Sequence, residues 1–255
     1  MPRVIKTVIP CIRRSLGERG LIISLGRSVL LPIHLFQEYR RAKSNRAIKV
    51  RSEFDLENHV DTDGEINGWT HLSDLDIPSA NWIYGNHYAP IEPARFRAIF
   101  SSLSLFSGLN VAYEDFVFID FVSGKGRALL LASEFPFRRV LGVEFSPDLH
   151  AIAKGNIERY ASRRKSGPVE SVCMDFLNFT PPPEPLILFF FDPCEAPILT
   201  KLIHNLHESL IANHGDCYLV YVAPTQSRKT VLDTAKWLSK VAEDAELRAF
   251  VYRVS

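Results

Sequence analysis

The sequence predicts an α/β protein with a doubly wound, mostly parallel sheet and an N-terminal helical and irregular extension. Two observations lead to this fold class. From about residue 116 onward, short apolar segments alternate with amphipathic ones, a pattern typical of parallel strands joined by right-handed helical crossovers. One segment, Leu186–Phe191, is apolar at every position, as expected of a strand covered on both faces.

Composition favours a soluble globular protein, because 46% of the 255 residues are hydrophobic and 23% are charged. Four cysteines are scattered along the chain without a Cys-x-x-Cys pair. This spacing predicts neither a zinc site nor a disulfide framework, and it favours a reducing, cytoplasmic setting. No metal ligands are predicted.

Charge is distributed unevenly. Residues 1–51 carry a net charge of +10 and the rest −9, within a total of +1. We expect residues 1–50 to form amphipathic helices, and the apolar run Leu21–Phe36 is interrupted by Arg27 and Pro32. That run is shorter than the roughly 20 residues that cross a bilayer. A helix packed on the body is the favoured interpretation, with peripheral membrane contact through residues 1–50 or a nucleic-acid arm as alternatives.

Residues 51–82, here called the connector, are polar and rich in turn-forming residues. Its Asp61-Thr-Asp-Gly-Glu65 cluster lacks the third acid and the distant glutamate of an EF-hand calcium loop. A surface turn is the favoured interpretation, and an ordered connector that closes over a neighbouring site is an alternative. We therefore divide the chain into the arm and connector, residues 1–82, and a second domain, residues 83–255.

The second domain begins with the aromatic turn Tyr84–Pro90 and a helix over Glu92–Leu105, in which Pro93 suits the first turn. A buried strand over Phe116–Ile119 then ends at Asp120. The turn Ser123-Gly-Lys-Gly126 follows, and its glycines permit positive φ angles and close approach of a ligand.

The remaining elements follow in strict alternation. Strands are expected at Phe137–Glu144, Val169–Met174, Leu186–Phe191, Cys217–Val222 and Leu247–Val254, and helices at Arg127–Ser133, Leu149–Arg163, Ile198–Ile211 and Thr230–Val241.

Four successive strands of this prediction end in an acidic residue: Asp120, Glu144, Asp175 and Asp192. Ligands of open α/β sheets bind at the carboxyl ends of the strands. The Ser123–Gly126 turn does not fit a P-loop, and Leu129 replaces the third glycine of a dinucleotide fingerprint. A nicotinamide-dependent oxidoreductase is therefore a weaker interpretation.

Residues of about 84–255 resemble the class I S-adenosylmethionine-dependent methyltransferases. Asp120–Gly126 resembles the first motif of that family, Asp/Glu-x-Gly-x-Gly-x-Gly, and Asp192-Pro-Cys-Glu195 resembles its fourth. Two further patterns also resemble a little-characterised bacterial subgroup of that family: Ser52-Glu-Phe-Asp followed by Asp61-Thr-Asp-Gly64, and Tyr84 followed by Tyr88-Ala-Pro90. The resemblance implies that S-adenosylmethionine is the cofactor. It also implies that Glu144 binds the ribose hydroxyls of the cofactor and that Asp175-Phe176 binds its adenine. The implied cofactor-binding residues are Tyr88, Asp120, Val122, Ser123, Gly124, Gly126, Glu144, Phe145, Asp175, Phe176 and Asp192.

Three departures from that family stand out. Val122 replaces the first glycine of the motif, and a β-branched side chain crowds such a turn if its φ is positive. The fourth motif is not the Asp/Asn-Pro-Pro-aromatic tetrad of exocyclic amine methylation. Only one terminal strand, Leu247–Val254, is evident where the family has a hairpin.

The resemblance implies methyl transfer to an unidentified acceptor. Asp192 is the candidate catalytic residue that orients or deprotonates the nucleophile, and Tyr84, His87 and Tyr88 are expected to cover the ligand. Because the body is acidic, a small molecule or a protein is favoured over nucleic acid as acceptor. The main alternative is an inactive binding module in which Val122 marks a decayed cofactor site.

Overall fold

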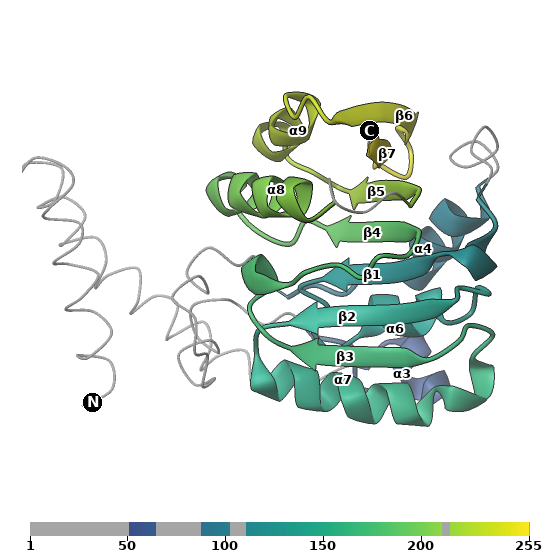
Figure 1. Cartoon of the computed structure of the whole chain (residues 1–255). Helices are drawn as coiled ribbons and strands as arrows, with labels where there is room; N and C mark the ends of the chain where they lie inside the picture. Colours follow the sequence, from purple (N-terminus) through teal and green to yellow (C-terminus); the bar gives the residue numbers. More distant parts are fainter. Residues whose placement is uncertain (1–50, 65–87, 103–110, 211–214, 255) are drawn as a thin grey trace, which may run out of the picture. The chain divides into compact units, whose positions relative to one another are not determined.

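The computed structural model describes residues 51–64, 88–102, 111–210 and 215–254 (Figure 1). Internal contacts separate Met1–Lys49 from Val50–Ser255, and every described residue belongs to the second unit. The predictions for residues 1–50, Tyr84 and His87 lie outside the described residues, and the proposed domain division at residue 82 stays a prediction. None of the helices in the described ranges has the length and hydropathy needed to cross a bilayer.

The described residues form a seven-stranded sheet in the order β3-β2-β1-β4-β5-β7-β6 (Figure 1). The strands are β1 Val117–Phe121, β2 Arg139–Glu144, β3 Val169–Cys173, β4 Leu186–Phe191, β5 Cys217–Val222, β6 Leu238–Asp244 and β7 Ala249–Val254. Strands β1 to β5 pair in parallel, and β7 is antiparallel to both β5 and β6. This confirms the predicted doubly wound, mostly parallel fold, whose strand order reverses between β1 and β4.

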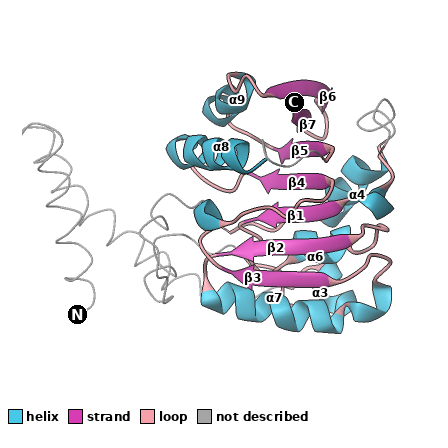
Figure 2. Cartoon of the chain, viewed as in Figure 1, coloured by secondary structure: helices cyan, strands magenta, loops and turns pink. Residues whose placement is uncertain are grey.

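Helices alternate with the strands (Figure 2). They are α3 Glu53–Asn58, α4 Pro93–Ser101, α6 Arg127–Ala132, α7 Pro147–Arg159, α8 Ala196–Leu210 and α9 Gln226–Asp233, with 3-10 turns at Tyr113–Asp115, Ala161–Arg163 and Phe176–Asn178. Local sequence explains the start of α7, where the Ser146 side chain accepts a hydrogen bond from the Leu149 amide and Pro147 occupies the first turn.

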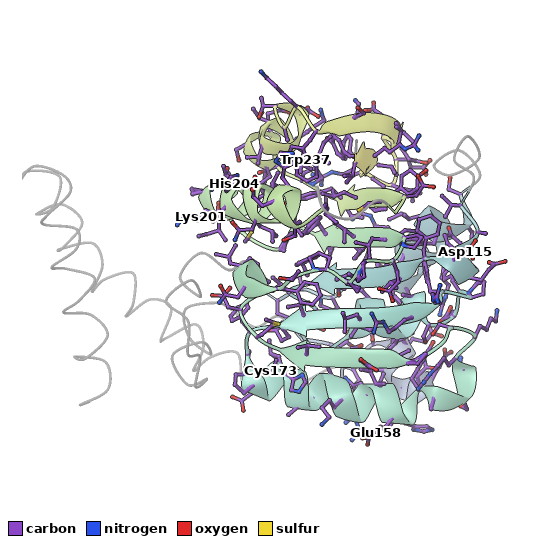
Figure 3. All side chains as sticks on the ribbon, in the orientation of Figure 1. Asp115, Glu158, Cys173, Lys201, His204 and Trp237 are labelled. Carbon is purple, nitrogen blue, oxygen red and sulfur yellow. The ribbon has the colours of Figure 1, made fainter. Side chains whose placement is uncertain are left out.

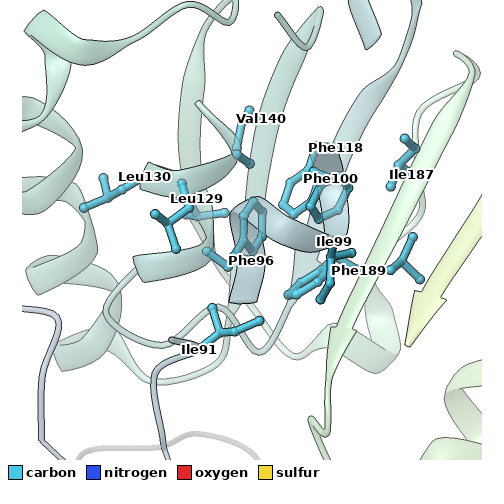
Figure 4. Packing of buried hydrophobic residues seen from close by; sticks show 14 of the residues in the cluster. Ile91, Phe96, Ile99, Phe100, Phe118, Leu129, Leu130, Val140, Ile187 and Phe189 are labelled. Carbon is cyan, nitrogen blue, oxygen red and sulfur yellow. The ribbon is translucent and has the colours of Figure 1, made fainter. Parts of the chain in front are cut away.

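The sheet has a hydrophobic core on each face. On one face, Phe96 and Phe100 of α4 pack with Phe118 and Phe189 of the sheet (Figure 4). On the other face, α8 packs against alternate residues of the same strands, including Ile119. Neighbouring residues of β1 thus enter opposite cores, which explains why the strand is apolar almost throughout.

The C-terminal prediction was partly wrong. The helix expected over Thr230–Val241 begins earlier, at Gln226, and ends at Asp233, and Leu238–Asp244 forms β6. Among the strands that the structure describes, β6 pairs only with β7. Its middle residues are exposed, so it lacks the apolar pattern of a buried strand. The terminal hairpin implied by the family resemblance is therefore present.

Candidate functional site

A cavity lies at the carboxyl ends of β1, β2 and β4, beside the point where the strand order reverses. Its volume is about 70 Å³. Eight of the predicted cofactor residues line it: Tyr88, Asp120, Val122, Ser123, Gly124, Glu144, Phe145 and Asp192. Arg127 and Leu149 also line it and were not predicted.

The turn after β1 has a left-handed backbone at three alternate positions. The φ angles are 62° at Val122, 56° at Gly124 and 86° at Gly126. A left-handed conformation costs a non-glycine residue roughly 1–2 kcal/mol, so Val122 is strained as the sequence led us to expect. Its amide nevertheless donates a 2.9 Å hydrogen bond to the Val143 carbonyl, which holds the turn against β2.

Gly126 has a packing role. A Cβ atom at this position would lie 3.2 Å from the Cβ of Ala153 in α7. Gly126 precedes α6 and does not line the cavity, so it allows α6 and α7 to approach each other closely.

Glu144 links the end of β2 to the glycine turn. Its carboxylate is fully buried and accepts hydrogen bonds from the amides of Gly124, at 2.7 Å, and Ser146, at 2.8 Å. Burial raises the pKa of Glu144 to about 7, against the lowering effect of these amides. The Phe145 amide is a third donor to this carboxylate. A carboxylate has about four acceptor positions, so the three amides leave about one position for a ligand.

Asp120, on β1, is buried near Glu144 of the adjacent strand β2. Burial raises the pKa of Asp120 well above its usual range, and the charge of Glu144 raises it further. The buried hydroxyl of Ser123 also lines the cavity, and it has no hydrogen-bond partner among the described atoms. Two carboxyl groups and a hydroxyl therefore border the same space.

The third predicted strand end lies just outside the cavity lining. The Asp175 carboxylate accepts a 2.9 Å hydrogen bond from the Leu177 amide and caps a 3-10 turn. Phe176 is buried, with its ring centroid 6.2 Å from that of Phe145. Phe145 thus connects this pair to the cavity, and the adenine-binding role of Asp175 and Phe176 stays a prediction.

Asp192 follows β4 and has a left-handed backbone with φ of 48°. Its carboxylate accepts hydrogen bonds from Arg228 of α9, at 2.5 Å, and from the Tyr221 hydroxyl, at 3.2 Å. Burial raises the pKa of Asp192, and the Arg228 charge opposes that effect. These contacts fix the carboxylate at the cavity edge. Sequence reasoning missed both partners because they come from later elements.

The connector docks on the glycine turn through Arg127, the first residue of α6. Arg127 is buried and donates from Nε to Thr62 Oγ1 at 2.6 Å and from Nη2 to Asp63 at 2.6 Å and Asp55 at 3.2 Å. Lys125 donates to the Asp63 carbonyl at 2.6 Å. The two basic residues of the motif therefore bind the connector.

Asp55 and Thr62 are fully buried in this contact. The Asp55 carboxylate accepts hydrogen bonds from the amides of Thr62, at 2.7 Å, and Asp63, at 2.8 Å. The surface-turn interpretation of the Asp61–Glu65 cluster is therefore wrong for the buried Thr62, and the described residues 61–63 are ordered by these contacts. Closure of the connector over a neighbouring site stays a prediction. No group of three or more acidic, histidine or cysteine side chains placed to hold a metal occurs within the described residues.

Tyr88 lies between the connector and the glycine turn. Its hydroxyl donates a 2.7 Å hydrogen bond to the Thr62 carbonyl. Its ring lies so close to Gly124 that a Cβ atom on this glycine would be 2.2 Å from the ring. Only glycine fits here, for its positive φ and for this approach.

Cysteines take no part in the lining of this cavity. Among the described cysteines, Cys194 and Cys217 are buried free thiols, and Cys173 is an exposed one at the end of β3 (Figure 3).

No family model and no curated protein matches the chain. Among solved structures, it is similar to an O-methyltransferase family 2 protein from Planctomyces limnophilus at 13% identity, with 55% of this chain and 50% of that chain covered and a TM-score of 0.41. It is similar to the putative methyltransferase yhhF from Escherichia coli at 17% identity, with 75% and 99% covered and a TM-score of 0.46.

An RNA methyltransferase from Salinibacter ruber, solved in complex with S-adenosyl-L-homocysteine, is similar at 19% identity, with 66% and 92% covered and a TM-score of 0.39. The chain spans half the length of the O-methyltransferase. At these TM-scores none of the three carries weight on the activity of this chain.

Proposed function

We propose that this chain binds S-adenosylmethionine at the cavity bordered by β1, β2 and β4 and transfers its methyl group to an acceptor that is a small molecule or a protein. The observation that carries the proposal is the arrangement of Asp120, Gly124 and Glu144. The first-motif turn and the second-strand acid, predicted from separate parts of the sequence, are joined by the hydrogen bond between the Gly124 amide and Glu144.

The residues present suit such a cofactor chemically. A ribose diol needs acceptors, and Glu144 has acceptor capacity beyond its amide donors Gly124, Phe145 and Ser146. The Ser123 hydroxyl, which has no hydrogen-bond partner among the described residues, and the Asp120 carboxyl add polar groups beside it. The cavity of about 70 Å³ is smaller than the roughly 300–1,000 Å³ of ligand sites, so we infer that its lining moves when the cofactor enters.

When bound, the cofactor supplies a methyl group that is already activated as a sulfonium, so the protein has mainly to align the reactants and exclude water. Asp192 is our candidate to orient or deprotonate the acceptor. Its bonds to Arg228 and Tyr221 restrict the carboxylate to one orientation at the cavity edge. Because its pKa is raised, Asp192 accepts a proton more readily than an ordinary aspartate does.

The test is thermal unfolding with S-adenosylmethionine or S-adenosylhomocysteine. A ligand at 100 times its Kd is expected to add about 2.7 kcal/mol to the free energy of unfolding. In Glu144→Gln the Kd of the cofactor should rise about tenfold, because the variant lacks a charged acceptor for hydrogen bonds from hydroxyl groups. The thermal stabilisation at a given ligand concentration should fall accordingly. Glu134→Gln is the matched control, because Glu134 binds Arg97 and Tyr160 and does not line the cavity.

If neither S-adenosylmethionine nor S-adenosylhomocysteine stabilises the protein, the proposal is wrong. If binding is found, mass spectrometry of cell lysate incubated with S-adenosylmethionine carrying a labelled methyl group identifies the acceptor.

The strain at Val122 favours one competing function, a catalytically inactive binding module with a decayed site. Replacing Val122 by glycine relieves the left-handed strain. A large gain in cofactor affinity in Val122→Gly supports the inactive module, whereas tight binding by the wild-type protein refutes it. A nicotinamide-dependent oxidoreductase would instead show heat stabilisation by NAD or NADP in the same assay.

A further inference from the structure

We infer that Arg127 and Thr62 are positioning residues that act on Tyr88, and that the hydrogen bond between Tyr88 and Thr62 sets the rate at which the cofactor enters its site. This inference rests on the proposed function. It concerns the entry of the cofactor, which the motif residues themselves do not determine.

The first step is the anchoring of Thr62. Its hydroxyl accepts a 2.6 Å hydrogen bond from Arg127 Nε and donates a 2.5 Å hydrogen bond to Asp55. Its amide donates to the same Asp55 carboxylate. With its side chain and amide both engaged and no exposed surface, Thr62 presents its carbonyl from a fixed position.

The Thr62 carbonyl in turn fixes the position of Tyr88. The Tyr88 hydroxyl donates to it at 2.7 Å, while Asp63, the next residue along the chain, accepts from Arg127. The buried guanidinium of Arg127 is therefore connected to the Tyr88 ring through two residues of the connector.

The Tyr88 ring covers the backbone of Gly124 in the glycine turn. The contact is so close that no side chain fits between the ring and the Gly124 backbone. Asp120, Ser123 and Glu144 border the same cavity. Because the cavity is smaller than a ligand of nucleoside size requires, displacement of Tyr88 is the movement that most directly opens it.

Entry of the cofactor then requires the Tyr88–Thr62 hydrogen bond to break. A protein whose binding-competent form is a minor population binds its ligand more slowly and weakly in proportion to that population. Weakening the bond enlarges the open population, while the residues of the glycine turn itself stay unchanged.

The experiment measures the association rate constant of S-adenosylhomocysteine by stopped flow or surface plasmon resonance with the full-length protein. Tyr88→Phe keeps the ring and removes the hydroxyl. We expect the association rate constant to rise about fivefold, the factor given by one neutral hydrogen bond. Tyr113→Phe is the matched control, because the Tyr113 hydroxyl donates a similar bond to the Phe100 carbonyl away from the cavity.

Arg127→Lys and Thr62→Val test the positioning role, and Thr62→Val serves alone if the arginine variant does not fold. Each is expected to raise the association rate constant. Neither should raise it further in a Tyr88→Phe background, because residues that act through one contact are not additive. A purely structural role for Thr62 would lower the unfolding midpoint and leave the association rate unchanged.

The outcomes separate the two proposals. If the wild-type protein binds no S-adenosylhomocysteine, the proposed function is wrong. If it binds and Tyr88→Phe associates no faster than the Tyr113→Phe control, the positioning inference alone is wrong. Additive effects of Thr62→Val and Tyr88→Phe would also overturn it.

Discussion

Among single residues of the site, Glu144 links burial to the pH dependence of stability. Its carboxyl has no exposed surface and a pKa raised to about 7. An acid with a raised pKa binds its proton more tightly in the folded protein than in the unfolded chain. The contribution of Glu144 to the free energy of unfolding is therefore greatest at low pH, and it is lost as the pH rises from about 4.5, the usual value, through about 7.

We therefore predict that Glu144→Gln flattens this dependence. The loss of stability between pH 5 and pH 8 should be smaller in the variant by on the order of 2 kcal/mol, measured by urea unfolding at both values. The remaining slope contains Asp120, whose pKa is raised in the same direction. Glu158→Gln, on the exposed face of α7 (Figure 3), is the control, and an equal change in both variants would contradict the assignment.

Residues whose role depends on local sequence were predictable, and those whose role depends on distant partners were not. Asp120 and Glu144 were placed in one site because each was predicted at the end of an apolar strand and parallel strands align their carboxyl ends. Arg127 was predicted only as the first residue of a helix. Its partners Thr62 and Asp63 lie more than 60 residues earlier, and opposite charge in the connector and the turn was the only signal in the sequence.

At the scale of elements, the contact between the connector and α6 depends on a buried ion pair. Nη2 of Arg127 lies 3.2 Å from Asp55, and both side chains are almost fully buried. We predict that Asp55→Ala and Arg127→Met each cost about 3 kcal/mol of unfolding free energy. Arg127→Met leaves the buried Asp55 carboxylate without its cation, and Asp55→Ala removes the acceptor of the Thr62 and Asp63 amides and leaves Arg127 with Asp63 as its ion-pair partner. The double variant should cost at least 1 kcal/mol less than the sum.

Denaturant unfolding of the two single variants and the double variant measures this coupling. The exposed pair Arg253 and Asp216, 3.0 Å apart with both side chains more than half exposed, is the control and should couple by less than about 1 kcal/mol. Coupling of Asp55 and Arg127 as weak as that of the exposed pair would show that the connector is not held by this contact.

Elements were predictable in proportion to their burial. The sequence predicted β4 and β5 with the boundaries found in the structure, because every residue in them is apolar. The first four residues of β6, Leu238–Val241, were assigned to a helix and the rest to no element, since Leu-Ser-Lys-Val-Ala-Glu-Asp has exposed polar residues and no strand periodicity. It is a strand only because β7 supplies its backbone partners, and single-sequence propensity cannot detect such pairing.

At the scale of the whole molecule, the contacts divide the chain after Lys49. We predict that a chain beginning at Val50 unfolds cooperatively with a midpoint within about 4 °C of the full chain, the shift expected for less than 1 kcal/mol. Differential scanning calorimetry measures this. Loss of cooperative unfolding in the shorter chain would contradict the prediction. Binding to anionic vesicles, compared between the two chains, tests the membrane contact proposed for residues 1–50.

The position of β7 has a consequence for synthesis on the ribosome. Strand β7 lies between β5 and β6 in the sheet but follows both in the chain. While residues 249–254 are still inside the exit tunnel, β5 has an open edge and β6 has no neighbour to pair with. Open strand edges recruit other chains, so we expect the edge of β5 to be open to aggregation and to chaperone binding until β7 has emerged and paired with it.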